Sequence, residues 1–437
     1  MNYYVDDYKK QFSYETDTAA INQAIKDCSE NGGGKVIFSQ DTLYRAGLVN
    51  ILSNVELHFE EGSKLMASDN LVDFAINGTI SDDKKISQPT WENCDYSGAP
   101  NKFFLYAKEV ENISLSGEGT IDGNEEIFYG NVTKWHIDGY FYPRVPLIFF
   151  EGCKKVSITN VTLQRSAFWT THLVGCENVL VENVKILNNL RLANCDGIDP
   201  DHCKNVKIKN CHIEAADDCI VFKTTENAFK YGACENIEVS GCTLMSTSAA
   251  IKFGTESVCD FKNIYIHDCK IVKSNRGIAF QLRDEGNISN IKFENIDIET
   301  RRFAPIYWWG KAEPIVITAV QRRLDSKVGT ISNVIFENIN ADSENGIFIF
   351  GEDVQNIKDI RFNNVNINVK AKTDWEKNTY DLRPCEKYQI INSPMSVVKI
   401  NNAKDITFVN FNYQIDDSIS KDIKENFEFT NSKDILI

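Results

Sequence analysis

Aspartates form two clusters near the middle of the chain, about twenty residues apart. The first lies in Asn194-Cys195-Asp196-Gly197-Ile198-Asp199, and the second is the pair Asp217-Asp218. Hydrolysis of a glycosidic bond needs two carboxyl groups, and inverting enzymes hold them roughly 6.5–9.5 Å apart so that a water molecule fits between them. The clusters therefore predict a hydrolytic site if the fold brings them together.

The aspartates could also form turns or bind calcium. Asp is common in turns, because its side chain hydrogen-bonds the local backbone. Asp oxygens also bind calcium, but the sequence has no Asp-x-Asp-x-Asp-Gly spacing, so calcium is the second choice. The pair Asp217-Asp218 favours chemistry, because the apolar run Cys219-Ile220-Val221-Phe222 follows it at once. Two carboxylates at the start of a buried strand predict a shared proton or a bound water.

A short phrase of alternating apolar and polar residues recurs from about residue 50. Copies begin at Asn54, Asn112, Lys155, Asn178, Asn205, Asn236, Asn263, Asn290 and Asn333. The alternation is typical of half-buried strands, and the Asn, Gly or Asp that breaks it tolerates a sharp left-handed bend. Two-residue hairpin turns are absent, and the period of about 22 to 30 residues leaves no room for helices. The pattern predicts an all-β fold, a single-stranded right-handed parallel β-helix, whose turns rise by about 4.8 Å.

The start of the chain differs from the repeats. Thr16 or Asp17 is predicted to N-cap a helix that ends at Asn31-Gly32-Gly33-Gly34, and this helix would cover the open end of the core. No linker divides the chain, so a single domain is predicted. Its predicted extent is 1–437, with an N-terminal cap at about 1–35, coils over about 36–415 and a C-terminal cap at about 370–437.

Composition narrows the possible partners. The formal net charge of −15 argues against nucleic acid or an anionic membrane. The 13 cysteines include no CxxC pair and no Cys/His ligand spacing, so no metal, no cofactor and no disulfide framework is predicted. Cys211, Cys242 and Cys269 share one inward slot of the repeat and are predicted to be buried thiols. The sequence shows no secretory signal and no transmembrane segment, which predicts a cytoplasmic location.

Longer stretches interrupt the repeats, and such loops on a rigid scaffold usually carry binding. They span about 67–104, 124–146, 300–328 and 370–395. Trp308 and Trp309, beside Lys311, are candidates for a sugar platform, because aromatic faces suit the apolar face of a pyranose. Packing of this loop against the coil is an equal alternative.

The acidic clusters resemble the motifs Asn-Thr-Asp and Asp-Asp of the polygalacturonase family of glycoside hydrolases. The opening Asp17-Thr18-Ala19-Ala20-Ile21 and the segment Phe168-Trp169-Thr170-Thr171-His172-Leu173 are also similar to that family, and the resemblance covers about residues 15 to 365. The resemblance implies hydrolysis with inversion. Asp217 would be the general acid, and Asp196 and Asp218 would hold and activate the attacking water.

Two further motifs of that family are missing. Its Gly-His-Gly falls on Ser248-Ala249-Ala250, and its Arg-Ile-Lys, which grips a galacturonate carboxylate, falls on Ala279-Phe280-Gln281. Nearby cations are candidate replacements in substrate binding, although each alone is more often a surface charge. These cations are Lys223, Lys252, Arg276 and Arg283. Glu256 is a further candidate acid or a turn residue, and His172 is a candidate substrate contact or a structural histidine.

The sequence thus predicts a glycoside hydrolase that acts on a pectin-like oligo- or polysaccharide. Exo-action on galacturonide or rhamnogalacturonan oligosaccharides is the expected mode. Two rival functions stay open. A β-helix polysaccharide lyase would need Ca²⁺ or a cationic base, whereas a non-catalytic glycan-binding β-helix would keep the repeats without needing the acidic pairs.

Overall fold

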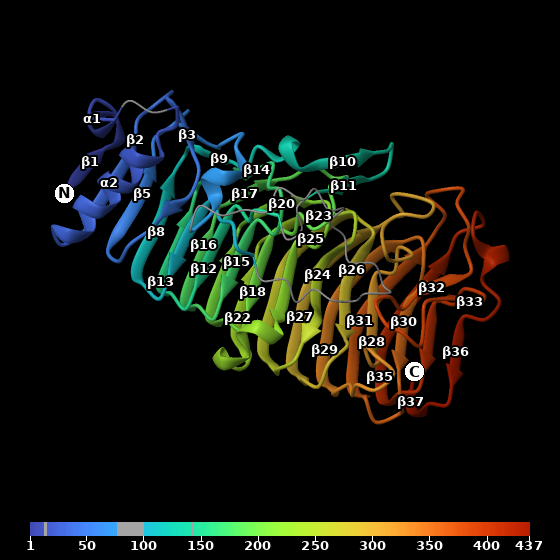
Figure 1. Cartoon of the computed structure of the whole chain (residues 1–437). Coiled ribbons are helices and arrows are strands. Elements are labelled where there is room, and N and C mark those ends of the chain that lie inside the picture. Colours follow the sequence, from blue (N-terminus) through green and yellow to red (C-terminus); the bar gives the residue numbers. More distant parts are fainter. Residues whose placement is uncertain (13–14, 77–99, 141–143) are drawn as a thin grey trace. The chain divides into compact units, whose positions relative to one another are not determined.

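The computed structural model describes residues 1–12, 15–76, 100–140 and 144–437. The chain divides into two units, which are drawn with their elements in Figure 1. Unit 1 comprises Met1–Gln88 and Gly98–Ala216, and unit 2 comprises Pro89–Ser97 and Asp217–Ile437. Parts of the predicted loops 67–104 and 124–146 lie outside the described residues. The single domain over 1–437 stays a prediction.

Unit 1 begins with the predicted cap. Strand β1 (Asn2–Tyr4) and helix α1 (Val5–Lys9) lead to helix α2 (Thr18–Glu30), which has Asp17 at its N-cap. Helix α2 buries the face predicted from its spacing, namely Ala20, Ile21, Ala24, Ile25 and Cys28. The Asp17 carboxylate does not cap the helix, because it accepts a hydrogen bond from the Arg45 N–H at 2.9 Å and contacts Lys9 Nζ at 3.1 Å.

The strands of unit 1 form three rows in which each strand pairs in parallel with the next. The first row is β2 (Gly34–Phe38), β5 (Val55–Phe59), β8 (Glu111–Gly117), β13 (Lys154–Thr159), β16 (Glu177–Glu182) and β19 (Lys204–Lys209). The second is β3 (Leu43–Ala46), β6 (Lys64–Ala67), β9 (Thr120–Asp122), β14 (Thr162–Gln164), β17 (Lys185–Leu187) and β20 (His212–Ala215). The third is β4 (Val49–Asn50), β7 (Leu105–Lys108), β12 (Ile148–Glu151), β15 (Thr171–Val174) and β18 (Ile198–Asp201). A hairpin of β10 (Tyr129–Val132) and β11 (Ile137–Gly139) interrupts them.

Unit 2 continues the same construction with longer strands. One row is β22 (Cys234–Ser240) and β23 (Thr243–Ser246), then β25 (Phe261–Ser274), β27 (Ile288–Thr300), β29 (Ile331–Ser343), β31 (Ile357–Val369), β35 (Lys404–Ile415) and β37 (Lys433–Leu436). The other is β21 (Ile220–Thr224), β24 (Ala249–Ser257), β26 (Arg276–Leu282), β28 (Ile315–Ala319), β30 (Ile347–Gly351), β34 (Val398–Asn401) and β36 (Phe427–Thr430). The short hairpin of β32 (Thr379–Asp381) and β33 (Ile390–Asn392) lies outside both rows.

The predicted bends occur at the asparagines of the repeat. Asn183, Asn210 and Asn295, which break the alternation, have φ angles of 56°, 54° and 56°. Asn236 and Asn263, which begin copies of the repeat, have φ angles of 59° and 58°. All of them adopt the left-handed conformation that Asn tolerates better than most residues. Their side chains also hydrogen-bond from coil to coil, for example from Asn263 Nδ2 to Asn236 Oδ1 at 3.1 Å. The same residue type therefore makes the turn and links successive turns.

The interior of unit 2 is a stack of aromatic rings and aliphatic side chains. Phe336 lies between Phe293 and Phe362, with ring centroids 5.1 and 4.8 Å away. The three cysteines of the shared slot are buried, Cys211 in unit 1 and Cys242 and Cys269 in unit 2, as predicted. The hydrogen bond to Cys242, together with burial, raises the pKa of the Cys269 thiol, which keeps it protonated.

Candidate active site

The acidic pair Asp217-Asp218 lies immediately before β21, at the start of a buried strand as predicted. Asp217 is half-buried, and its carbonyl oxygen accepts a hydrogen bond from Ser246 Oγ at 2.6 Å. Asp218 is 1% exposed. Two adjacent carboxyl groups therefore have different surroundings, which is the condition for giving an acid and a base separate roles.

Three donors hold the Asp218 side chain. Ser248 Oγ and the Ala249 N–H donate to Oδ1 at 3.0 and 3.2 Å, and Lys252 Nζ donates to Oδ2 at 2.7 Å. A carboxylate has about four acceptor sites, so roughly one is left for a water molecule. Ser248 and Ala249 belong to the segment on which the missing Gly-His-Gly motif is predicted to fall, and here they hold Asp218.

Lys223 and Glu256 form a buried ion pair in β21 and β24, with Nζ 3.1 Å from Oε2. Burial alone would raise the pKa of Glu256, but the positive charges of Lys223, Arg322 and Lys252 more than offset it and lower the pKa to about 2. Glu256 is therefore ionised near neutral pH, and its role as a candidate acid stays a prediction. Its contact shows that it binds Lys223.

Acid should remove the contribution of the ionised Glu256 carboxylate to the unfolding free energy. A carboxyl group whose folded pKa lies below its unfolded value stabilises the fold above the unfolded pKa, and the contribution is lost as the pH falls towards the folded value. Between pH 4.5 and about 2, we expect wild type to lose ~3 kcal/mol more unfolding free energy than Glu256→Gln. Chemical denaturation at a series of pH values measures this difference. Glu337→Gln, in an exposed pair with Lys292, is the control, and equal acid sensitivity of wild type and Glu256→Gln would contradict the assignment.

Arg276 and Arg283 lie inside the protein, with exposed fractions of 2% and 0%. The Arg276 guanidinium contacts Glu313 Oε2 at 3.3 Å and donates to the Asp381 carbonyl at 2.6 Å. Arg283 donates to the carbonyl oxygens of Pro384 at 3.0 Å and Leu382 at 2.9 Å, and to Thr318 Oγ1 at 3.1 Å. Both arginines therefore anchor the segment around 381–384, and their predicted substrate contact stays a prediction.

Removal of the Arg283 guanidinium should test this structural role. Arg283→Met leaves several buried acceptors without a donor, so we expect a loss of about 3–5 kcal/mol in unfolding free energy. Denaturant titration measures this loss. Arg361→Met, in a surface pair with Asp359, should cost less than about 1 kcal/mol. An unchanged stability combined with a raised KM would instead support direct substrate binding by Arg283.

The predicted sugar platform lies in the loop between β27 and β28. Trp308 and Trp309 are half-buried, and the Arg383 guanidinium lies over the Trp309 ring at 5.3 Å from its centroid. The Lys311 N–H donates to Glu313 Oε2 at 2.8 Å, and burial lowers the pKa of the Lys311 ammonium. The loop packs through these contacts, and the sugar platform stays a prediction.

Unit 1 holds the remaining candidates. Asp196 is 2% exposed and precedes β18, and its carbonyl accepts a hydrogen bond from the Thr170 N–H at 2.9 Å. His172 in β15 is buried, with Nε2 3.1 Å from Asp201 Oδ2 and its ring against Phe149 and Trp169. These contacts favour the structural alternative for His172, and the substrate contact stays a prediction. Asp196 belongs to unit 1 and the Asp217-Asp218 pair to unit 2, so their grouping stays a prediction.

Arg322 and Asp284 form an ion pair that sequence reasoning missed. Arg322 Nε and Nη2 each lie 2.8 Å from the Asp284 carboxylate, and Nη2 also donates to the Thr255 carbonyl at 2.6 Å. Ser257 Oγ donates to Asp284 Oδ2 at 3.2 Å. This pair supports the end of β24, which carries Glu256. It joins residues 38 apart in the chain, and no local pattern marks such a pair.

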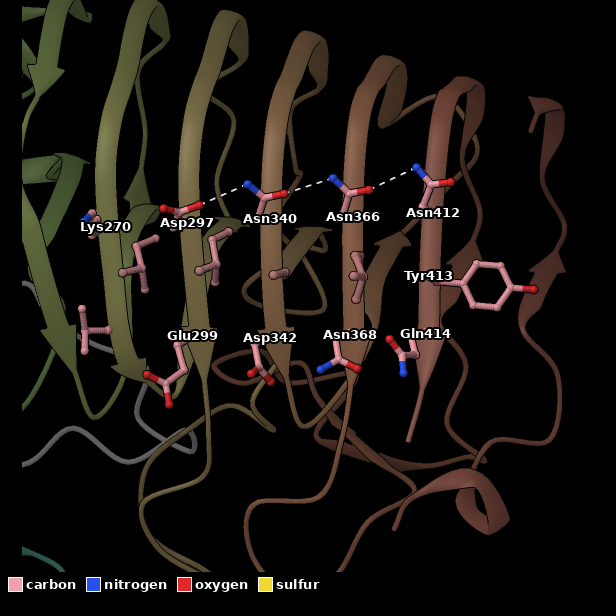
Figure 2. Close-up of a pocket in the computed structure, with 15 residues that line it drawn as sticks. Lys270, Asp297, Glu299, Asn340, Asp342, Asn366, Asn368, Asn412, Tyr413 and Gln414 are labelled. Atoms are coloured by element: carbon pink, nitrogen blue, oxygen red, sulfur yellow. Dashed lines mark hydrogen bonds between the residues drawn. The ribbon is translucent and has the colours of Figure 1, made fainter. Parts of the chain in front are cut away.

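A separate polar groove of about 660 Å³ lies over β25, β27, β29, β31 and β35 in unit 2. Figure 2 shows its row of amides, in which Asn340, Asn366 and Asn412 each donate to the preceding side chain of the row, starting at Asp297. The predicted site residues do not line this groove. Its spacing follows the coil repeat, as expected for a ladder that stabilises the sheet.

The described residues were also expected to contain no metal site and no membrane-spanning segment. No group of three or more His, Cys, Asp or Glu side chains there could hold a metal ion. No helix in the same ranges is long and apolar enough to span a membrane. The cytoplasmic location stays a prediction.

The fold and the acidic pair define a class, namely parallel β-helix proteins with paired carboxyl groups at the start of a strand. The family model for glycosyl hydrolases family 28 matches residues 69–386, which is more than half of the chain, so the protein belongs to this family. The resemblance seen in the motifs is thereby confirmed.

Individual relatives agree with the family. A probable polygalacturonase of Vitis vinifera is 24% identical over 301 residues, covering 67% of this chain and 59% of that protein. The chain thus spans little more than half the length of this relative and of Polygalacturonase-2 from Solanum lycopersicum, of which it covers 56%. An endo-polygalacturonase of Pectobacterium carotovorum subsp. carotovorum is 22% identical over 375 residues, covering 83% of this chain and 86% of that protein.

Solved structures show the fold. The Yersinia enterocolitica family 28 exopolygalacturonase aligns with a TM-score of 0.71 at 17% identity, covering 100% of this chain and 78% of that one. The Thermotoga maritima exopolygalacturonase aligns with a TM-score of 0.60 at 16% identity, covering 98% of this chain and 92% of that one. The predicted right-handed parallel β-helix is confirmed.

Proposed function

We propose that the protein is a glycoside hydrolase that cleaves a glycosidic bond in a pectin-like saccharide with inversion at the anomeric carbon. Membership of family 28 supports the reaction class. The observation that carries the proposal is the arrangement at β21, where a half-buried Asp217 stands beside an Asp218 held by three donors. One carboxyl group is accessible to substrate, and its neighbour is fixed.

In this mechanism Asp217 is the general acid. It gives a proton to the glycosidic oxygen as the bond from that oxygen to the anomeric carbon breaks. Asp218, with Asp196 as the second carboxylate that the family motif implies, accepts a proton from water as the water oxygen bonds to the anomeric carbon. The products are a free sugar of inverted configuration and the shortened saccharide. Exo-action on oligosaccharides is part of the proposal, and exopolygalacturonases among the relatives are compatible with it.

The test is incubation of the full chain with a panel of pectic oligosaccharides, followed by NMR during the first turnovers. We expect the first-formed product to carry the anomer opposite to that of the substrate bond. A product of retained configuration would contradict inversion. An unsaturated product that absorbs in the ultraviolet would show a lyase, and binding without any cleavage would show a glycan-binding protein.

A further inference from the structure

Three cations of unit 2, namely Lys252 on Asp218 and Lys223 and Arg322 around Glu256, are already paired with carboxylates of the protein. Lys252 contacts Asp218 at 2.7 Å, Lys223 contacts Glu256 at 3.1 Å, and Arg322 contacts Asp284 at 2.8 Å. The six side chains are only 1–18% exposed. A carboxylate on a bound sugar would have to displace one of these protein carboxylates from its cation. The displaced carboxylate would then be a buried charge without a partner, which is costly in free energy.

The other candidate cations are also engaged within the protein, so they do not provide a partner for a sugar carboxylate. Arg276 and Arg283 donate to carbonyl oxygens inside the protein. Gln281, at the position of the family's missing lysine, is 4% exposed and donates to the Arg383 carbonyl at 3.1 Å. The Lys311 N–H donates to Glu313 Oε2 at 2.8 Å, which ties this loop residue to the carboxylate that also contacts Arg276.

We name the ionisable side chains that Lys252 and Glu256 connect to Asp218 the Asp218 charge group. Its members are Asp217, Asp218, Glu256 and Asp284 with Lys223, Lys252 and Arg322. With Asp217 protonated as the general acid of the proposed mechanism, three carboxylates face three cations, so the group has no net positive charge. A sugar carboxylate would enter a mostly buried site in which these cations already have partners, and it would lose its hydration without gaining a partner of its own.

We propose that the sugar bound against the Asp218 charge group is uncharged. It is either a neutral sugar or a uronic acid whose carboxyl group is esterified. Neutral hydroxyl groups donate to carboxylates and accept from ammonium groups, so they suit a site in which both signs are present and balanced by the protein. The inference rests on the proposed hydrolase function and narrows its substrate class.

Two ligands that differ only in this charge provide the test. Oligogalacturonides and the same oligosaccharides after reduction of the carboxyl groups share their linkage and length. Isothermal titration of the inactive Asp217→Asn variant should show binding of the reduced ligand that is at least about tenfold tighter. Tighter binding of the charged ligand, equal binding, or binding of neither overturns the inference. Absence of turnover by wild type on either ligand would count against the hydrolase function alone, because the binding ratio is measured separately.

Removal of the carboxylate that pairs with Lys223 should reduce the preference for the uncharged ligand. In Glu256→Gln the Lys223 ammonium loses the Glu256 carboxylate and becomes able to meet a sugar carboxylate. Introduced into Asp217→Asn, this change should tighten binding of the charged ligand by about tenfold or more and leave the reduced ligand nearly unchanged. Glu337→Gln removes the same charge from an exposed Lys–Glu pair and should change neither. If Glu256→Gln unfolds the protein, the comparison of charged and reduced ligands on Asp217→Asn still tests whether the bound sugar is uncharged.

Discussion

Replacement of Asp217 by Asn should abolish turnover while the protein stays folded. The amide keeps the shape of the side chain but has no proton to give to the leaving oxygen, and loss of a general acid typically costs about 10²–10⁴-fold in rate. Asp217 is half-buried, and the amide fills the same volume as the carboxyl group that it replaces. The unfolding free energy should therefore shift by no more than about 1 kcal/mol. Steady-state kinetics on a cleaved pectic oligosaccharide, with denaturant titration, measure both quantities.

Asp297→Asn is the matched control for this experiment. Asp297 lies in β27 of the same unit and accepts a hydrogen bond from Asn340 Nδ2 at 3.1 Å, a role that an amide oxygen also fills. Its kinetics should equal those of wild type. If Asp217→Asn retained the wild-type rate, the assignment of the general acid would be refuted.

The coil architecture could be predicted because its causes are local. Alternation sets which side chains point inward, and the Asn at each bend, such as Asn183 and Asn210, indicates its left-handed backbone by residue type. The capping helix was equally predictable, since its buried face follows the helical period. The side-chain ladder of the asparagines in the repeat was not predicted, because it depends on the register between coils.

The place of the acidic pair in the fold could be predicted from the sequence, but the ion-pair partners of the candidate cations could not. The acidic pair was correctly placed at the start of a buried strand. The partners of the candidate cations could not be inferred from the sequence, because Lys223 and Glu256 are 33 residues apart and Lys252 and Asp218 are 34 apart. Arg283 shows the same limit. A residue that directly follows β26 gives no sign in the sequence that the segment 382–384 covers it.

These pairings show what holds the Asp218 carboxylate in a chain that lacks the histidine of the Gly-His-Gly motif. Ser248 and the Ala249 N–H hold one oxygen of Asp218, and Lys252 holds the other. The protein thus orients this carboxylate by a hydroxyl, a backbone amide and an ammonium. Of these three donors the ammonium alone carries charge, so Lys252 is a positioning residue whose loss should matter most.

Lys252→Met should therefore lower both activity and stability. It leaves Asp218, 1% exposed, with only its two uncharged donors, and removal of one partner of a buried pair costs roughly 3–5 kcal/mol. We expect kcat to fall by about 100-fold, because the carboxylate that receives the proton from water is no longer fixed. Denaturant titration and steady-state kinetics measure these losses. Lys292→Met, which breaks exposed pairs with Glu294 and Glu337, should cost less than about 1 kcal/mol and leave kcat unchanged.

The double variant Lys252→Met/Asp218→Asn separates positioning from simple support of the fold. It removes both charges together, so no buried carboxylate is left without its cation, and most of the lost stability should return. Activity should not return, because the proton acceptor is gone. Recovery of both would mean that Asp218 serves only as the structural partner of Lys252, and the base would then have to be another carboxylate. Recovery of stability alone is the result that the geometry around Asp218 requires.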